Sequence, residues 1–219
     1  MADEIRFLVA PMTRLDVPRV AELHTQVFPG YFLTRLGKGI LETMYDEFVV
    51  SARAWPFVCK ESNEIVGFVV GVRDLRAIKK SIAIKRWTRV LANLTPQLAK
   101  EPSLVIPLAQ RLLPSLQPWR RNGNSDLNHV SPSYLLSIGV AEKVRGTQAA
   151  SLLTQALFGK LETQGLERVA LYTRVTNERS RAFFEKVGFR FVCITGVGDD
   201  ASVIYERELH PTKVVQMFK

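Results

Sequence analysis

The sequence predicts an α/β protein of the α+β kind, in which helices flank a mixed, mostly antiparallel central sheet. Short apolar runs rich in Val, Phe and Tyr, typical of strands, alternate with segments whose apolar residues recur at helical spacing. Hairpins are expected at both ends of the sheet, which argues against a doubly wound fold. The 219 residues, 47% hydrophobic and 23% charged, suffice for one large domain with a substantial core.

The first part of the chain is expected to supply a strand, two helices and a hairpin. The strand covers 5–10, and Asp16 is expected to cap a helix whose apolar residues share one face. A second helical pattern covers 36–50. Two strands, 55–60 and 65–74, flank a polar turn and should pair as a hairpin.

The last part of the chain alternates strands and helices before it closes on a second hairpin. Helical periodicity and strand-forming residues predict these elements in order: strand 134–140, helix 147–164, strand 168–175, helix 178–187, and strands 189–195 and 201–206.

Residues 75–122 form a basic segment that interrupts this pattern. It holds ten Lys and Arg against one acid, Glu101, so its charge of +9 equals the net charge of the whole chain. Five prolines, the first at Pro96, are expected to cut the segment into short pieces, of which 75–94 is a candidate helix.

Three interpretations of this basic segment stay open. It is a solvated face that closes over an active site and attracts anions, a membrane-surface element, or a nucleic-acid contact. Apolar residues such as Ile82, Trp87 and Leu91 between the basic ones favour the membrane over nucleic acid, for which no reading helix or stacking motif is present.

Other features of the composition limit the class of protein. Cys59 and Cys193 fall in expected strands and should be buried small hydrophobes, while three scattered histidines argue against a metal site. No apolar run reaches the roughly 20 residues that span a bilayer, and the first residues lack the order of a secretory signal. A cytoplasmic location is therefore expected, and the oligomeric state is not readable.

The stretch 133–157 indicates either an ordinary strand-to-helix turn or an anion site. An apolar strand ends near Val140, small residues follow at Gly146, Ala149 and Ala150, and a helix begins. The first N–H groups of a helix have no intrahelical partner and carry partial positive charge, and small side chains let a phosphate approach them.

Two segments of the sequence together resemble a known family. The stretch VRGTQAASLLTQAL resembles the acyl-CoA signature of the GNAT superfamily of N-acetyltransferases, with Arg145 and Ala150 in its first and last places and Gln148 in place of a glycine. The stretch NERSRAFFEKVGF resembles that family's second signature. Its matching residues are Asn177, Ser180, Phe183, Phe184, Gly188 and Phe189.

The resemblance implies acetyl-CoA as co-substrate, without a metal. The strand edge at Ile138 and Val140 would pair with the pantetheine arm, and the backbone N–H of Val140 would face the thioester oxygen. The pyrophosphate would lie among Arg145, Gly146, Gln148, Ala149 and Ala150, and Asn177, Ser180 and Phe184 would contact the rest of the cofactor.

Phe184 stands where many family members carry a tyrosine that protonates the leaving thiolate. Solvent, Tyr172 or Tyr134 would then supply the proton, or the protein binds acyl-CoA without transfer. Candidate general bases near strand ends are Glu142, Asp74, His129 and Tyr134, and the acceptor wall is expected at Phe28, Tyr31 and Asp74.

Residues 1–219 are thus expected to form a single GNAT-like acyltransferase domain with a basic insertion at 75–122. Its predicted activity is transfer of an acetyl group from acetyl-CoA to a primary amine, by direct attack in a ternary complex. The acceptor is an amino sugar, a small metabolite or a protein amine, and the basic insertion favours an anionic one. The alternatives are a non-catalytic acyl-CoA sensor and a membrane-peripheral protein.

Overall fold

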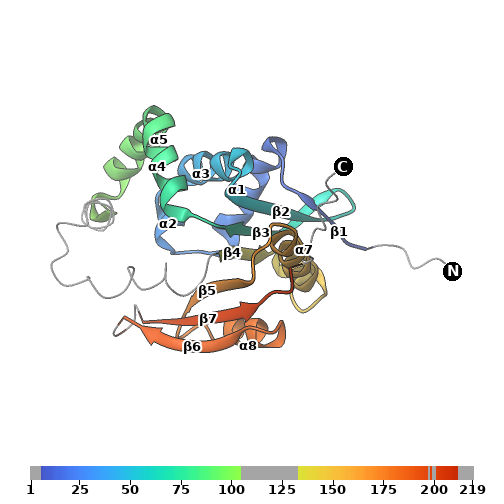
Figure 1. Cartoon of the computed structure of the whole chain (residues 1–219). Helices are drawn as coiled ribbons and strands as arrows, with labels where there is room; N and C mark the ends of the chain where they lie inside the picture. The colour runs from blue at the N-terminus through green and yellow to red at the C-terminus, as the bar shows by residue number, and fades with distance from the viewer. Residues whose placement is uncertain (1–5, 105–132, 197, 199–200, 212–219) are drawn as a thin grey trace, which may run out of the picture.

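The computed structural model describes residues 6–104, 133–196, 198 and 201–211. Within these ranges, seven strands form one sheet in the order β1-β2-β3-β4-β5-β7-β6 (Figure 1). The β4–β5 pair is parallel and the other neighbouring pairs are antiparallel. The strands are β1 (Leu8–Pro11), β2 (Ala54–Glu61), β3 (Glu64–Val72), β4 (Tyr134–Val140), β5 (Arg168–Arg174), β6 (Arg190–Thr195) and β7 (Ser202–Glu208). The predicted fold class is confirmed.

Helices cover both faces of the sheet. On one face lie α1 (Val17–Val27) and α3 (Lys38–Val50), joined by the short α2 (Phe32–Arg35); on the other lie α7 (Ala149–Thr163) and α8 (Glu178–Lys186). Successive side chains of a strand point to opposite faces, so Phe68 of β3 packs with α1 and α3 while Val69 packs with α7. The sheet is therefore buried on both sides at β2 and β3.

Most element boundaries lie close to those predicted from the sequence. The first strand begins at Leu8, later than the predicted 5–10, and the last extends to Glu208, because its pairing with β5 continues beyond residue 206. Asp16 is the N-cap residue of α1, as predicted, but its side chain makes no capping hydrogen bond. Its carboxylate accepts hydrogen bonds from the backbone N–H (2.8 Å) and the hydroxyl (2.7 Å) of Thr13, and pairs with Lys60 at 2.9 Å.

The described part of the basic segment forms two helices, α4 (Leu75–Lys85) and α5 (Trp87–Lys100), which meet at Arg86 and lie outside α3 (Figure 1). The prediction that Pro96 ends a helix was wrong, because Pro96 lies inside α5. It is exposed, whereas Leu94 packs with Leu36 and Leu104 in a small separate core. This packing holds the helix although the proline lacks an N–H to donate. The remainder of the segment, 105–122, lies outside the described residues, as do His129 and the apolar stretch 214–218.

Ion pairs join the basic helices to α3. Arg86 Nε lies 2.9 Å from Glu47 Oε2, and Arg86 Nη1 lies 3.3 Å from Asp46 Oδ2. Arg86 is only 15% exposed and Glu47 only 6%, so this pair is largely shielded from water. Part of the predicted basic face is therefore neutralised by packing on the body of the protein.

The two cysteines differ in burial. Cys59 is buried as predicted, but Cys193 is exposed and that prediction was wrong, because β6 is the edge strand and its first five residues are exposed. Among the described residues, no group of three or more His, Cys, Asp or Glu side chains gathers in a way that could hold a metal ion. No described helix combines the length and apolar character needed to cross a membrane.

Candidate active site

The parallel neighbours β4 and β5 stay together only at their first residues. Tyr134 is opposite Ala170, and the Ala170 N–H donates to the Ser133 carbonyl at 2.9 Å. Beyond this point the recorded partner of β5 is β7, and that of β4 is β3. Among the described residues, the β4 edge facing β5 is therefore unpaired toward its carboxyl end. We call this opening the β4–β5 gap.

A β-bulge bends β4 where the gap begins. Val70 of β3 is opposite Ser137, and the next residue, Gly71, is opposite Leu135, so Leu136 is the extra residue. A bulge interrupts the ladder and increases the local bend and twist of its strand. The bulge thus turns the last residues of β4 away from β5.

The hydrogen-bond alternation of β4 directs two backbone N–H groups into the gap. The Ala141 N–H donates to the Val66 carbonyl at 2.7 Å on the β3 side. Alternate residues of an antiparallel strand point their N–H groups to opposite edges, so those of Ile138 and Val140 point away from β3. These are the two strand residues expected to contact an acyl-CoA.

The turn after β4 presents further backbone donors. Gly146 has φ of +82°, and a Cβ built there would meet no atom within 4 Å, so the backbone is open to solvent. The Thr147 hydroxyl donates to the Val144 carbonyl at 2.7 Å and holds the turn in place. Among the described residues, the N–H groups of Gly146, Gln148 and Ala150 have no acceptor in the protein. We call this segment, 144–150, the phosphate turn.

Side chains at the phosphate turn leave those donors accessible. Arg145 and Gln148 are exposed, and Arg145 pairs with Glu142 at 3.6 Å. Ala149 is fully buried and packs in the core beneath α7, so its small side chain sets the position of the helix start. The arrangement suits an anion held by backbone N–H groups at a helix start.

The second predicted signature lies beside the carboxyl end of β5. The side-chain oxygen of Asn177 accepts from the Ser180 N–H at 3.2 Å and caps α8. Phe184 is 6% exposed, with ring centroids 5.6 Å from Phe183 and 5.8 Å from Phe189. Phe184 is thus a core residue in this structure, and its contact with a cofactor stays a prediction.

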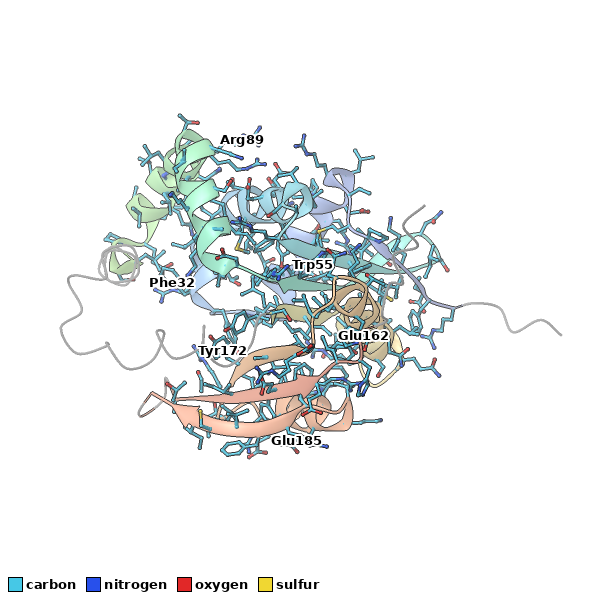
Figure 2. The ribbon with its side chains drawn as sticks, viewed as in Figure 1. Phe32, Trp55, Arg89, Glu162, Tyr172 and Glu185 are labelled. Atoms are coloured by element: carbon cyan, nitrogen blue, oxygen red, sulfur yellow. The ribbon has the colours of Figure 1, made fainter. Side chains whose placement is uncertain are left out.

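Four aromatic residues gather on the face of the sheet covered by α1 and α3, and we call them the aromatic wall. The Phe28 and Tyr31 rings lie 5.5 Å apart, and those of Tyr134 and Tyr172 stack at 6.1 Å with 7° between their planes. The Arg174 guanidinium lies 4.8 Å from the centroid of the Tyr31 ring and so links β5 to the loop after α1. Figure 2 shows Tyr172 on the side of the molecule that also carries Phe32.

The predicted acidic residues lie near the two ends of β4 and make contacts of their own. Asp74 caps α4, accepting from the Ala77 N–H at 2.9 Å, and lies 3.6 Å from Arg53. Glu142 is 89% exposed and follows the end of β4, whereas Tyr134 begins that strand. Six residues of strand separate Tyr134 from Val140, roughly 20 Å. Glu142 and Tyr134 therefore lie at opposite ends of β4.

Two residues that the sequence analysis passed over form a buried polar pair beside β4. His24 Nδ1 lies 2.8 Å from the Tyr45 hydroxyl, and the His24 ring stacks on Phe68. Burial lowers the pKa of His24 to about 4 and raises the pKa of Tyr45. His24 lies on the apolar face of the predicted helix with Val20 and Val27, so helical spacing could have identified it as buried.

Tyr172 also has a shifted pKa. Burial, and to a lesser extent the neighbouring Tyr134, raise the pKa of its hydroxyl above the ordinary value for tyrosine. Its side chain is nevertheless 40% exposed. The hydroxyl is protonated at neutral pH and is therefore a donor, not a base.

The diverging β4–β5 pair and the turn beside it lie in the part of the chain that a sequence comparison identifies. The sequence model of the acetyltransferase (GNAT) family matches residues 120–189, which include β4, the phosphate turn and α8. The matched segment is less than half of the chain, and it holds the β4–β5 gap and the phosphate turn. N-alpha-acetyltransferase 30 of Schizosaccharomyces pombe is 32% identical over 56 residues, which are 26% of this chain and 37% of that relative's length.

Solved structures of acetyltransferases share the fold over almost the whole chain. One is described as histone acetyltransferase HPA2 and related acetyltransferase from Corynebacterium glutamicum, with a TM-score of 0.60 and 15% identity over 96% of this chain and 100% of that one. Another is the ribosomal-protein-S18-alanine N-acetyltransferase from Escherichia coli, with a TM-score of 0.56 and 14% identity over 97% of this chain and 99% of that one. Ard1 from Thermoplasma volcanium has a TM-score of 0.56 and 14% identity over 94% of this chain and 99% of that one. At these identities the likeness concerns the fold.

Proposed function

We propose that the protein is an N-acetyltransferase that moves an acetyl group from acetyl-CoA to a primary amine by direct attack in a ternary complex. One observation carries the proposal: the unpaired edge of β4 at Ile138 and Val140 leads directly into the phosphate turn. The edge offers N–H groups at one end, and the turn offers unpaired N–H groups at the other. An extended ligand with amide groups and a pyrophosphate fits this order of donors.

The residues present fit acetyl-CoA. Backbone donors at Gly146, Gln148 and Ala150 would hold the phosphates at the start of α7, where the helix dipole favours negative charge. The open space at Gly146 admits a phosphate close to the backbone. We propose that the Gln148 side chain, exposed at the N-cap, donates to a phosphate in place of the usual glycine backbone contact.

When bound, acetyl-CoA would supply an activated acyl group and a thiolate leaving group with a pKa of about 8.5. The amine nitrogen forms a bond to the acyl carbon, the carbon–sulfur bond breaks, and the extra proton on nitrogen passes to a base or to water. The Val140 N–H would donate to the acyl oxygen as negative charge develops there. A donor fixed in the main chain needs no reorganisation for this role. Holding both substrates together would supply much of the rate.

The proton for the leaving thiolate has two sources in this proposal. Phe184 has no hydroxyl, so we propose Tyr172, which is protonated at neutral pH and partly exposed, as the protein donor. Solvent is the other. Tyr134 stacks on Tyr172 and would position its ring. Because Glu142 pairs with Arg145 and Asp74 is engaged with α4 and Arg53, we propose that water accepts the proton of the amine.

The basic helices support a further role at an anionic surface. Ile84 is 62% exposed and Leu91 53% exposed, and the same two helices carry the exposed Lys80, Lys85 and Arg89. We propose that 75–122 is an insertion in a single domain and touches anionic membranes or carriers of the acceptor. Sedimentation with anionic vesicles, comparing the full chain with one lacking 75–122, tests this role. If both chains stay in the supernatant, the membrane role of 75–122 is rejected.

Calorimetry and thiol release together test the proposed function. The full chain should bind acetyl-CoA and release CoA thiol in the presence of at least one amine from a broad panel. Binding without release for every amine would favour a non-catalytic acyl-CoA sensor, which the replacements at Gln148 and Phe184 make the second candidate. No binding at millimolar acetyl-CoA would reject both functions.

A further inference from the structure

Arg174 is the last residue of β5, toward whose carboxyl end the β4–β5 gap opens. Its guanidinium carbon is 4.8 Å from the centroid of the Tyr31 ring. Arg174 and Tyr172 are two residues apart on one strand, so their side chains leave the same face of the sheet. Tyr172 stacks on Tyr134, which begins β4. The cation therefore stands within the aromatic wall and not at a random surface position.

Arg174 has no carboxylate partner among the described residues. Other arginines near the sheet and its helices do: Arg86 pairs with Glu47, Arg53 with Asp74, and Arg168 with Glu206. The contact recorded for the Arg174 side chain is the Tyr31 ring. Its positive charge is thus balanced by no acid in the described parts of the chain.

Stacking on an aromatic ring leaves the edge of a guanidinium free to bind. The flat group lies over the ring, and its N–H donors point outward in a planar fork that matches a carboxylate or a phosphate. The Tyr31 backbone is itself fixed, because its N–H donates to the Phe28 carbonyl at 3.3 Å and its carbonyl accepts from the Arg35 N–H at 3.0 Å. The guanidinium of Arg174 thus lies against an aromatic ring whose backbone is held in place.

We propose that Arg174 binds an anionic group, a carboxylate or a phosphate, on the body of the acceptor amine. This inference rests on the proposed function, since it places the acceptor between the aromatic wall and the open edge of β4. The aromatic wall would bury the apolar part of the acceptor, and Arg174 would select acceptors with negative charge. The acceptor class is therefore an amine that also carries an acidic group.

The test begins with the best acceptor found by thiol release from acetyl-CoA over an amine panel. The panel contains matched pairs that differ in the anionic group: glucosamine 6-phosphate with glucosamine, phosphoethanolamine with ethanolamine, and β-alanine with β-alaninamide. The best acceptors should be the anionic members, and the pairs distinguish phosphate from carboxylate. Loss of the anionic group should lower kcat/KM by about ten- to a hundredfold, the usual range for a charge-assisted hydrogen bond.

Variants of Arg174 assign the preference to this side chain. Arg174→Gln should lower kcat/KM for the anionic acceptor by the same factor, and leave the neutral member of the pair unchanged. Arg174→Lys, which keeps the charge but not the planar fork, should lose less. Arg190→Gln, on the exposed edge strand β6, is the matched control and should behave as wild type. Acetyl-CoA affinity, measured by calorimetry, should be equal in all four proteins.

Three outcomes would overturn the inference. Equal kcat/KM for the members of each pair would do so, as would an unchanged preference in Arg174→Gln; in both cases acetyl transfer itself would stand. Binding of acetyl-CoA without turnover of any amine would remove the proposed transfer function, and this inference with it.

Discussion

The imidazole Nδ1 of His24 lies 2.8 Å from the hydroxyl of Tyr45, in the layer between α1, α3 and the sheet. His24 is 5% exposed and Tyr45 is fully buried. Phe28 and Phe68 enclose the imidazole ring at centroid distances of 4.8 and 5.9 Å. A neutral imidazole fits this surrounding, whereas an imidazolium would be a buried charge without a carboxylate among the contacts recorded for it.

His24 should make the protein less stable as the pH falls. Burial lowers its pKa to about 4 in the folded state, against 6.5 for an ordinary histidine, so the unfolded chain binds the proton more readily. Stability should therefore be complete above about pH 6.5, fall as the pH drops toward 4, and lose about 2 kcal/mol between pH 7 and 5. Denaturant unfolding at both pH values measures the loss.

The control variants for this prediction are His24→Asn and His210→Gln. The first keeps an acceptor for Tyr45 but does not titrate, so the change in its unfolding free energy between pH 7 and 5 should be about 2 kcal/mol smaller. The second alters an exposed histidine and should follow wild type. If His24→Asn shows the same pH dependence as wild type, the lowered pKa of His24 is wrong.

Gln148→Asp should separate stability from cofactor binding. Gln148 is exposed at the N-cap of α7, where aspartate is favoured, so the unfolding free energy should rise by about 0.5–1 kcal/mol or stay unchanged. The added carboxylate would repel the CoA phosphates, so calorimetry should show acetyl-CoA affinity reduced by at least about tenfold. Gln148→Asn, neutral at the same position, should bind within about threefold of wild type. Undiminished affinity in Gln148→Asp would exclude this turn as the phosphate site.

Arg86→Gln should destabilise the protein more than Arg89→Gln. Both arginines pair with acids of α3, but Arg86 is 15% exposed and holds the buried Glu47, whereas Arg89 is 64% exposed. Loss of Arg86 leaves Glu47 uncompensated and should cost about 3 kcal/mol, against less than about 1 kcal/mol for Arg89. Denaturant unfolding measures both costs, and limited proteolysis of 75–104 should be faster in Arg86→Gln alone. An equal loss of unfolding free energy in the two variants would contradict the burial of the Arg86–Glu47 pair.

Tyr172→Phe should lower kcat by about ten- to a hundredfold without changing acetyl-CoA affinity, if the Tyr172 hydroxyl gives its proton to the thiolate. Because Tyr172 is 40% exposed, the loss of its hydroxyl should change the free energy of unfolding little. The measurement is single-turnover thiol release with calorimetry on the same preparation. A kcat equal to wild type would identify solvent as the proton source.

Local patterns were sufficient to predict the order of strands and helices along the chain and the turn after β4. Apolar alternation predicted β2 and β3, and the small residues Gly146 and Ala149 predicted the turn that the structure contains. The bulge at Leu136 could not be predicted in the same way, because its position depends on the register against Val70 and Gly71 of another strand. Neither β4 nor β3 alone carries that information.

Long-range side-chain pairs were likewise beyond reach of the sequence. Arg86 and Glu47 are 39 residues apart, and nothing in either local pattern indicates that one shields the other. Arg174 and Tyr31 are far apart in the sequence, and they meet because the fold brings the end of β5 beside the loop after α1. The continuation of α5 through Pro96 could not be predicted either, because it depends on the packing of Leu94 against Leu36 and Leu104.

The most direct measurement is titration of the full chain with acetyl-CoA in a calorimeter, followed by thiol release with the amine panel. Micromolar binding that Gln148→Asp weakens, together with amine-dependent release of CoA, is the expected result. Absence of binding at millimolar acetyl-CoA would contradict the assignment of the β4–β5 gap and the phosphate turn as an acetyl-CoA site.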